Sequence, residues 1–210
     1  SLLADDAIAA LHAARRLAGK RVARIGFQGP SQGGWVAPIA ASRERVDFVI
    51  VSFGLAVSVL HEDREAMEFQ MKLKGHGPDV IARALEIGDA AARVFESGFT
   101  EGIEKLDAVR ARYRDEPWYA DVRGNFTWIL LPLTPDQIRT AGAKFRWGTP
   151  FAYDPLPTLE RLDVPQLWVV AGLDVDAPSG DTVRRLDGLI ANGRPVTRAI
   201  YPFAEHGMTE

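Results

Sequence analysis

The chain has no cysteine among its 210 residues, which excludes disulfides, thiolate nucleophiles and cysteine-based metal sites. It also lacks an uninterrupted apolar run of about 18 residues, the length that a membrane-spanning helix needs. No signal-peptide pattern precedes Leu2. The formal net charge is only −3, so there is no excess of positive charge for a polyphosphate partner. We therefore expect no membrane span and no nucleic-acid partner, and the compartment, cytoplasmic or exported, stays open.

The composition that is present is that of an ordinary globular protein. Hydrophobic residues make up 47% of the chain and charged residues 25%. This predicts one domain with a substantial core, or a core with a small cap. Basic residues gather within 15–21 and within 110–114, near the ends of predicted helices, where they would complement the helix dipole. We interpret both groups as solvated helix faces.

The most informative segment is Gly29-Pro30-Ser31-Gln32-Gly33, which places a serine between two glycines. Residues 21–27 before it are typical of a short apolar strand, and residues 32–42 after it of a helix that tolerates Pro38. The chain must turn sharply between these elements, and a Cβ on either flanking glycine is expected to collide with a neighbouring element. The pattern predicts Ser31 as a nucleophile presented at the end of a strand.

The same turn would aim the main-chain N–H of Gln32, and the positive end of the following helix, at the space where an oxyanion forms. A phosphate-binding loop is excluded, because no Lys-Ser or Lys-Thr pair follows Gly33 and the glycines lack the Gly-x-Gly-x-x-Gly spacing. A glycine-rich turn that only packs a helix remains an alternative on the motif by itself.

A serine nucleophile needs a base and an acid that orients it, and both follow predicted strands further along the chain. The apolar run 164–171 leads into an acidic turn that contains Asp174, and the strand-like run 195–201 is followed by a loop that contains His206. Residues at the carboxyl ends of parallel strands converge on one crevice, so Ser31, Asp174 and His206 are predicted to meet there. Asp176 competes with Asp174 as the acid, and Asp174 is favoured because it follows the strand more closely.

The other histidines fit the role of base less well. His12 lies within a predicted amphipathic helix that ends near Gly19, whereas His61 and His76 lie in the long middle segment. None of the three follows a predicted strand of the sheet.

The middle of the chain is expected to be helical. Residues 45–53 are typical of a second apolar strand, and nothing strand-like returns before Val164. Two apolar stripes at helical spacing lie within 81–95 and 103–113, and Thr134-Pro135-Asp136-Gln137 has the pattern of a capping box with proline at the first helical position. The segment is too long for a loop, so an all-helical insertion that covers the strand ends is predicted.

Aromatic residues gather in the irregular parts of this insertion. They are predicted to form either the core of a small helical subdomain or the wall of an apolar acyl pocket. The residues are Trp118, Tyr119, Phe126, Trp128 and Trp147.

At this point the chain resembles the α/β-hydrolase superfamily, whose triad runs in the order nucleophile, acid, histidine. The closer resemblance is to bacterial serine hydrolases near the dienelactone-hydrolase and acylaminoacyl-peptidase branch, and it covers about half of the chain. The residues that carry it are the elbow 29–38, Asp154-Pro155-Leu156-Pro157 with Val164-Pro165 before the acid strand, and Glu205-His206-Gly207.

The resemblance implies an α/β-hydrolase fold, a parallel sheet with flanking helices, with its core in residues 1–53 and 154–210 and a helical cap insertion at 54–153. It also implies a serine hydrolase that cleaves a small-molecule acyl substrate, with Ser31, Asp174 and His206 as the catalytic triad and the Gln32 N–H in the oxyanion hole. A carboxylic ester is expected rather than an amide, because no acidic or basic pocket motif specifies a peptide. No metal and no organic cofactor is implied. A serine peptidase and a non-catalytic, incomplete module are the alternatives.

The resembling fold has further strands ahead of the nucleophile strand, and this chain begins one helix before it. The sequence therefore predicts an incomplete core that lacks N-terminal strands. An apolar sheet face without its usual helices is an association hazard. We expect such a chain either to form a homo-oligomer or to need a missing N-terminal portion of the same fold.

Overall fold

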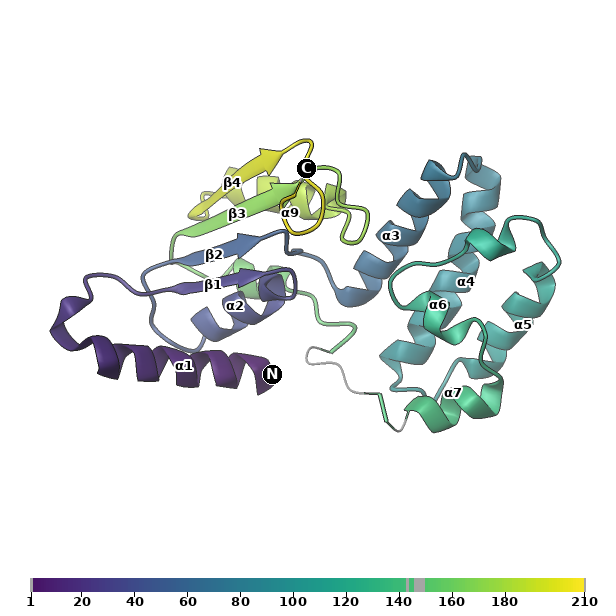
Figure 1. The fold of residues 1–210 in the computed structure, drawn as a ribbon, viewed down its shortest axis with the longest axis horizontal. Coiled ribbons are helices and arrows are strands. Elements are labelled where there is room, and N and C mark those ends of the chain that lie inside the picture. The colour runs from purple at the N-terminus through teal and green to yellow at the C-terminus, as the bar shows by residue number, and fades with distance from the viewer. Residues whose placement is uncertain (1, 143, 146–149, 210) are drawn as a thin grey trace. The chain divides into compact units, whose positions relative to one another are not determined.

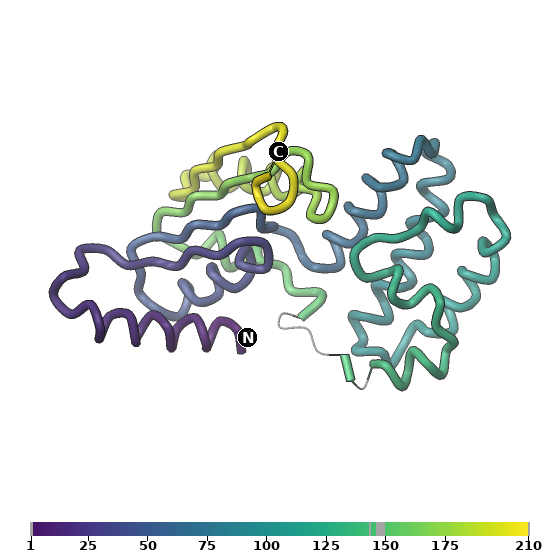
Figure 2. Tube along the Cα trace, in the orientation of Figure 1, coloured from purple at the N-terminus to yellow at the C-terminus, as the bar shows by residue number. Residues whose placement is uncertain are grey.

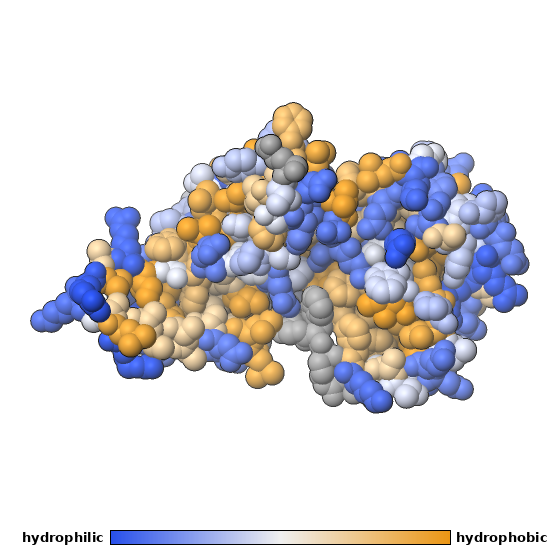
Figure 3. Space-filling view, in the orientation of Figure 1, coloured by the Kyte–Doolittle hydropathy of each residue, from blue (hydrophilic) through white to orange (hydrophobic). Residues whose placement is uncertain are grey.

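The computed structural model describes residues 2–142, 144–145 and 150–209. By contacts the chain divides into two compact units: a core unit of residues 1–58 and 153–210, and a helical unit of residues 59–152. None of the helices in the described ranges is long and apolar enough to cross a membrane. Hydrophilic residues are interspersed with hydrophobic ones on the face of each unit drawn in Figure 3.

The core unit is built on a four-stranded parallel sheet (Figure 1). The strands lie side by side in chain order, and register pairs Phe27 with Val49, Val49 with Gln166, and Gln166 with Val196. This parallel sheet with flanking helices confirms the fold class predicted from the sequence. Its strands are β1 (Phe27–Pro30), β2 (Val49–Ser52), β3 (Gln166–Ala171) and β4 (Val196–Tyr201).

The helices of the core unit pack on one face of this sheet. Every second strand residue, such as Val51, Trp168 and Val170, points into a buried cluster that also holds Leu11 from α1 and Leu186 from α9. Residues of the other sheet face, such as Ile50 and Leu167, are half-buried. The helices on the covered face are α1 (Leu2–Ala18), α2 (Gly33–Ala41), α8 (Leu156–Leu159) and α9 (Gly180–Ala191), and the 3-10 turn η1 (Gly19–Arg21) follows α1.

The prediction of a strand at 21–27 is wrong, because β1 begins only at Phe27. The Asp47 carboxylate accepts the Ile25 N–H at 2.7 Å, and the Asp47 N–H donates to the Ile25 carbonyl at 2.8 Å. The chain before Phe27 is therefore tied to the turn ahead of β2 rather than to a ladder. A Cβ on Gly26 would lie 2.3 Å from the Phe48 carbonyl oxygen, which shows how closely the two segments approach.

The helical unit contains the two predicted apolar stripes. They are the buried faces of α4 (Pro78–Glu96) and α5 (Ile103–Tyr113). The predicted capping box begins α7 (Pro135–Gly142), where the Thr134 N–H donates to Gln137 Oε1 at 2.8 Å. The sequence reading did not separate out the other helical segments, which are α3 (Val59–Leu73), η2 (Tyr119–Asp121) and α6 (Thr127–Leu130).

Aromatic rings fill the interior of the helical unit. Phe95 lies 4.7 Å from Phe151 and 6.1 Å from Phe126, measured between ring centroids. Trp118 is buried and packs on Tyr113 at 5.4 Å, whereas Trp128 is 48% exposed. Of the predicted aromatic residues, Trp118 and Phe126 therefore belong to the core of this unit, and Trp147 lies outside the described residues.

The interpretation of the basic residues within 110–114 as a solvated helix face is wrong for Arg110. Its side chain is buried, and its guanidinium donates to the carbonyls of Leu130, Leu131 and Leu133 at 2.7–3.0 Å. The Asp107 carboxylate accepts a further hydrogen bond from it at 2.7 Å. Arg110 thus binds carbonyl groups at and after the end of α6, which a guanidinium with five N–H donors does well.

A second buried charged group, Asp63 on α3, holds the start of α6. Its carboxylate accepts hydrogen bonds from the Phe126 N–H at 2.5 Å, the Thr127 N–H at 3.2 Å and the Thr127 hydroxyl at 2.6 Å. Gly124 reaches the same carboxylate so closely that a Cβ there would lie 2.5 Å from Asp63 Oδ1. Burial raises the pKa of Asp63 above its ordinary value, and the hydrogen bonds from Thr127 and Phe126 oppose that rise.

We expect Asp63→Ala to lower the free energy of unfolding of the helical unit by about 2 kcal/mol or more, because three donors lose their acceptor. Since the raised pKa means that the folded chain holds the proton more tightly, the part of the stability that comes from protonation of Asp63 is present below about pH 4 and is lost as the pH rises through the raised pKa. Asp63→Asn cannot ionise. Urea unfolding of both proteins across this range should therefore show the stability of Asp63→Asn, relative to wild type, increasing with pH; parallel curves would contradict the assignment.

Candidate active site

Ser31 stands at the tight turn between β1 and α2. β1 ends at Pro30, and Ser31 follows with a φ of 48°, in the left-handed region that non-glycine residues rarely adopt. The Ser31 N–H donates to the Ser52 carbonyl at 2.9 Å, and the Gly34 N–H donates to the Ser31 carbonyl at 2.9 Å. The strained backbone of Ser31 is therefore fixed on both sides, by β2 and by the first turn of α2.

Glycines make this turn possible, although not the pair that the sequence indicated. A Cβ on Gly29 would lie 2.7 Å from the Gly33 Cα, as predicted, whereas one on Gly33 would meet only Pro30 Cδ, at 3.7 Å. The predicted steric need for glycine at position 33 is therefore wrong. The other tight positions are Gly34, 2.7 Å from the Leu55 nitrogen, and Gly54, 2.6 Å from the Ser31 carbonyl oxygen. The chain that follows β2 presses against the turn and leaves no space for side chains there.

Gln32 occupies the N-cap position of α2. In the part of the chain that the structure describes, no acceptor takes its main-chain N–H. The first N–H groups of a helix have no partner within the helix and carry the positive end of its dipole. Such a group can stabilise negative charge that develops beside Ser31.

Asp174 and His206 are in direct contact. The Nδ1 of His206 lies 2.8 Å from Oδ2 of Asp174, whose side chain is only 2% exposed. The other carboxylate oxygen of Asp174 accepts the main-chain N–H groups of Asp176, at 3.1 Å, and Ala177, at 2.7 Å. Of the two acids that the sequence offered, Asp174 is the one against His206. Its buried carboxylate has both oxygens engaged, so it can hold the imidazole in one orientation.

The loops that carry these two residues are bound to each other. The Gly172 N–H donates to the Tyr201 carbonyl and the Leu173 N–H to the Ala204 carbonyl, both at 2.9 Å. Figure 2 shows the yellow loop after β4 beside the green loop after β3. A Cβ on Gly172 would lie 2.8 Å from the Pro202 Cα, so the two backbones are in close contact. The Asp174–His206 pair is thus carried by two loops, after β3 and after β4, that are bound tightly to each other.

The described contacts connect Ser31 and His206 only through the segment after β2. The Ser31 N–H donates to the Ser52 carbonyl. The residue after Ser52 is Phe53, whose ring packs edge-to-face on the His206 imidazole with 4.9 Å between the ring centroids. Among the described residues, the Ser31 hydroxyl makes no hydrogen bond with His206 or any other group. The structure therefore brings the acid and the base together, whereas the serine follows β1, which β2 separates from the acid strand β3.

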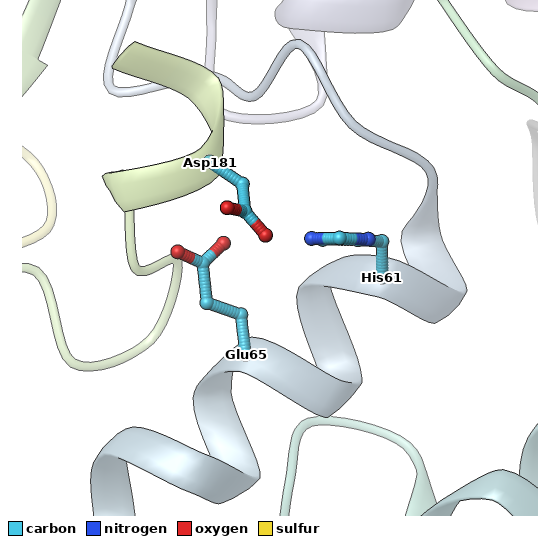
Figure 4. Close-up of side chains that lie close together, drawn as sticks. All are labelled: His61, Glu65 and Asp181. Carbon is cyan, nitrogen blue, oxygen red and sulfur yellow. The ribbon is translucent and has the colours of Figure 1, made fainter. Parts of the chain in front are cut away.

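The remaining histidines lie on helices or beside them: His12 is in α1, His61 is in α3, and His76 lies between α3 and α4. His12 on α1 is 3.2 Å from Glu44, and His76 is 2.9 Å from Asp121, whose pKa is lowered chiefly by that hydrogen bond. Figure 4 shows His61 and Glu65 projecting from successive turns of α3, and Asp181 in the first turn of α9, where it forms an ion pair with Arg184.

No protein-family model and no curated protein matches the sequence significantly. Solved structures do match. The acylaminoacyl peptidase of Pyrococcus horikoshii is 14% identical, with a TM-score of 0.47 over 97% of this chain and 23% of that one. A thermophilic esterase from Thermogutta terrifontis is 18% identical, with a TM-score of 0.41 over 92% of this chain and 61% of that one.

An α/β fold family hydrolase from Bacillus anthracis is 19% identical, with a TM-score of 0.47 over 97% of this chain and 68% of that one. The chain thus spans 23% and 61% of the first two solved proteins. Because these TM-scores are below 0.5, the function proposed below rests on the residues and contacts of this chain.

The close approach at the turn predicts that an alanine substitution lowers the stability of the protein at Gly29 and changes it little at Gly33. Gly29→Ala should lower the free energy of unfolding by about 1–3 kcal/mol, because its Cβ meets main-chain atoms that cannot move aside. Gly33→Ala is the matched control and should change stability by less than about 1 kcal/mol, since its Cβ has ordinary contacts and alanine favours the helix. Thermal unfolding of the two variants tests this, and equal losses would show that the turn is not packed as described.

Proposed function

We propose that this chain carries the catalytic groups of a serine hydrolase that cleaves carboxylic esters. The observation that carries the proposal is the 2.8 Å contact between His206 and the buried Asp174, at the sheet edge where Ser31 stands with a left-handed backbone. A buried acid, a histidine oriented by it, and a serine beside the N-terminus of a helix are the parts that acyl transfer through a covalent enzyme intermediate needs.

In this proposal the Ser31 hydroxyl oxygen attacks the substrate carbonyl while His206 accepts its proton. The tetrahedral intermediate places its negative oxygen near the Gln32 N–H, which supplies one oxyanion-hole donor. His206 then gives the proton to the departing alcohol. In the second half of the reaction, His206 takes a proton from the water that attacks the acyl-enzyme and returns it to the Ser31 oxygen as the acyl ester bond breaks. Asp174 accepts the Nδ1–H of His206 and so keeps that proton on Nδ1.

An ester is proposed rather than an amide because an alcohol leaves more readily than an amine. The resemblance of the elbow 29–38 and of Glu205-His206-Gly207 to the dienelactone-hydrolase and acylaminoacyl-peptidase branch supports a small acyl substrate and keeps a peptide bond as the second candidate. Matched p-nitrophenyl ester and p-nitroanilide substrates with the same acyl group separate the two.

Fluorophosphonate labelling tests the nucleophile. The wild-type chain should be labelled and Ser31→Ala should not, and the turnover of a p-nitrophenyl ester by Ser31→Ala should fall about a thousandfold or more. His206→Ala should lose nearly as much, because the groups act as one unit. Full labelling of Ser31→Ala would assign the nucleophile to another residue.

The two acids of the turn after β3 provide a matched control. Asp174→Asn should lower kcat by about a hundredfold or more, because the imidazole loses the partner that fixes its tautomer. Asp176→Asn changes the competing carboxylate in the same turn and should keep kcat within about twofold. The opposite result would exchange the roles of the two acids.

We also propose that the helical unit acts as a cap that sets the acyl preference of this site. Trp118 and Trp128 differ in burial within that unit, so the same substitution should act differently at each. Trp118→Ala should mainly lower the melting temperature, because it empties a packed position. Trp128→Ala should leave the melting temperature nearly unchanged and shift the ratio of short-ester to long-ester activity. An unchanged ratio in Trp128→Ala would exclude that residue from the acyl site.

A further inference from the structure

Phe53 carries a strained backbone directly after β2. Its φ is 41°, and its N–H donates to the Val169 carbonyl of β3 at 2.7 Å, so the conformation is held in place. A left-handed φ is unfavourable for a bulky side chain, and glycine would make the same turn without strain. Phe53 is half-buried and lies outside the buried cluster under the sheet. Packing of the core therefore does not explain why a phenylalanine stands here.

The other residues of the core unit with a strained backbone also follow strands and lie at the same edge of the sheet as Phe53. Among the described residues, the non-glycine positions of this unit with positive φ are Ser31, Phe53 and Met208. Ser31 follows β1, Phe53 follows β2, and Met208 is in the loop of His206 after β4. Strained backbones that gather at one site are characteristic of functional positions, where surrounding contacts hold a side chain in a required place.

His206 needs more than its hydrogen bond to Asp174 to be fixed. A single contact at Nδ1 holds that nitrogen but lets the imidazole pivot about the line to the carboxylate, which would swing the opposite ring edge. The His206 side chain is 30% exposed, so the bulk of the protein does not enclose it. The edge-to-face contact with the Phe53 ring, at 4.9 Å and an interplanar angle of 71°, supplies a second point of support.

We propose that Phe53 is a positioning residue for His206: its ring, anchored by the strained turn after β2, fixes the plane of the imidazole that Asp174 holds at Nδ1. The inference rests on the proposed function for its effect on catalysis, whereas its effect on the imidazole itself can be measured without substrate. Phe53 joins β2, the strand between the nucleophile strand and the acid strand, to the base.

The test compares Phe53→Leu with two matched variants. Phe53→Tyr keeps the ring, and Phe203→Leu removes another phenylalanine ring from the segment that leads to His206, where it is 71% exposed. The first measurement is proton NMR of the low-field Nδ1–H of His206, assigned by its loss in His206→Gln. The second is steady-state hydrolysis of a p-nitrophenyl ester together with fluorophosphonate labelling.

We expect the Nδ1–H signal to broaden or shift in Phe53→Leu and to persist in Phe53→Tyr and Phe203→Leu. The kcat of Phe53→Leu should fall about tenfold or more while KM stays within about twofold, because orientation of the base matters in the transition state rather than in substrate binding. Phe53→Tyr keeps the ring and should therefore retain most of the wild-type kcat.

An Nδ1–H signal equal in wild type and Phe53→Leu, or absent from wild type, would overturn the assignment of Phe53. A signal that responds to Phe53→Leu in a chain that neither labels nor hydrolyses esters would support the positioning role and refute the proposed hydrolase. The NMR signal therefore tests the role of Phe53, whereas labelling and ester hydrolysis test the proposed hydrolase.

Discussion

The arrangement of the candidate site depends on the parallel pairing of the four strands in chain order. Because all four strands point the same way, the residue after each strand emerges at the same edge of the sheet. Ser31 follows β1, Phe53 follows β2, Asp174 follows β3 and His206 follows β4. Residues that are distant in sequence thus become neighbours through backbone hydrogen bonds alone, before any of their side chains interact.

Close backbone contacts then make this edge rigid. Gly34 and Gly54 allow the chain after β2 to press against the Ser31 turn, and Gly172 allows the acid loop to press against the loop after β4. At each position a Cβ would meet main-chain atoms at less than 3 Å, so the segments cannot slide or separate without losing their packing. In the proposed hydrolase, a site built this way would be fixed before substrate binds, which is the condition under which N–H dipoles and an oriented imidazole stabilise a transition state effectively.

Features that depend on local chemistry could be predicted from the sequence. The apolar stripes of α4 and α5 and the capping box at Thr134 follow from residue spacing and turn signals. The direct contact between Asp174 and His206 joins two residues that were selected because each follows a strand. The start of β1 could not be predicted in the same way. Residues 21–26 are apolar enough for a strand, but Asp47, distant in sequence, binds Ile25 through its side chain and its main chain ahead of the first ladder residue.

The residues that sequence reasoning missed are those whose role exists only between segments. Nothing in its own sequence neighbourhood marks Asp63 as the buried cap of a helix more than sixty residues later, or Arg110 as the ligand of three carbonyls. Phe53 is the sharpest case, because Ser-Phe-Gly reads as the plain end of an apolar strand. Its left-handed backbone is imposed from outside, by β3 through the Val169 carbonyl on one side and by the tight packing of Gly54 against Ser31 on the other. The turns at Phe53 and Ser31 are therefore held by different strands but touch each other where Gly54 packs against the Ser31 carbonyl, so a change that relaxed one turn would be felt by the other.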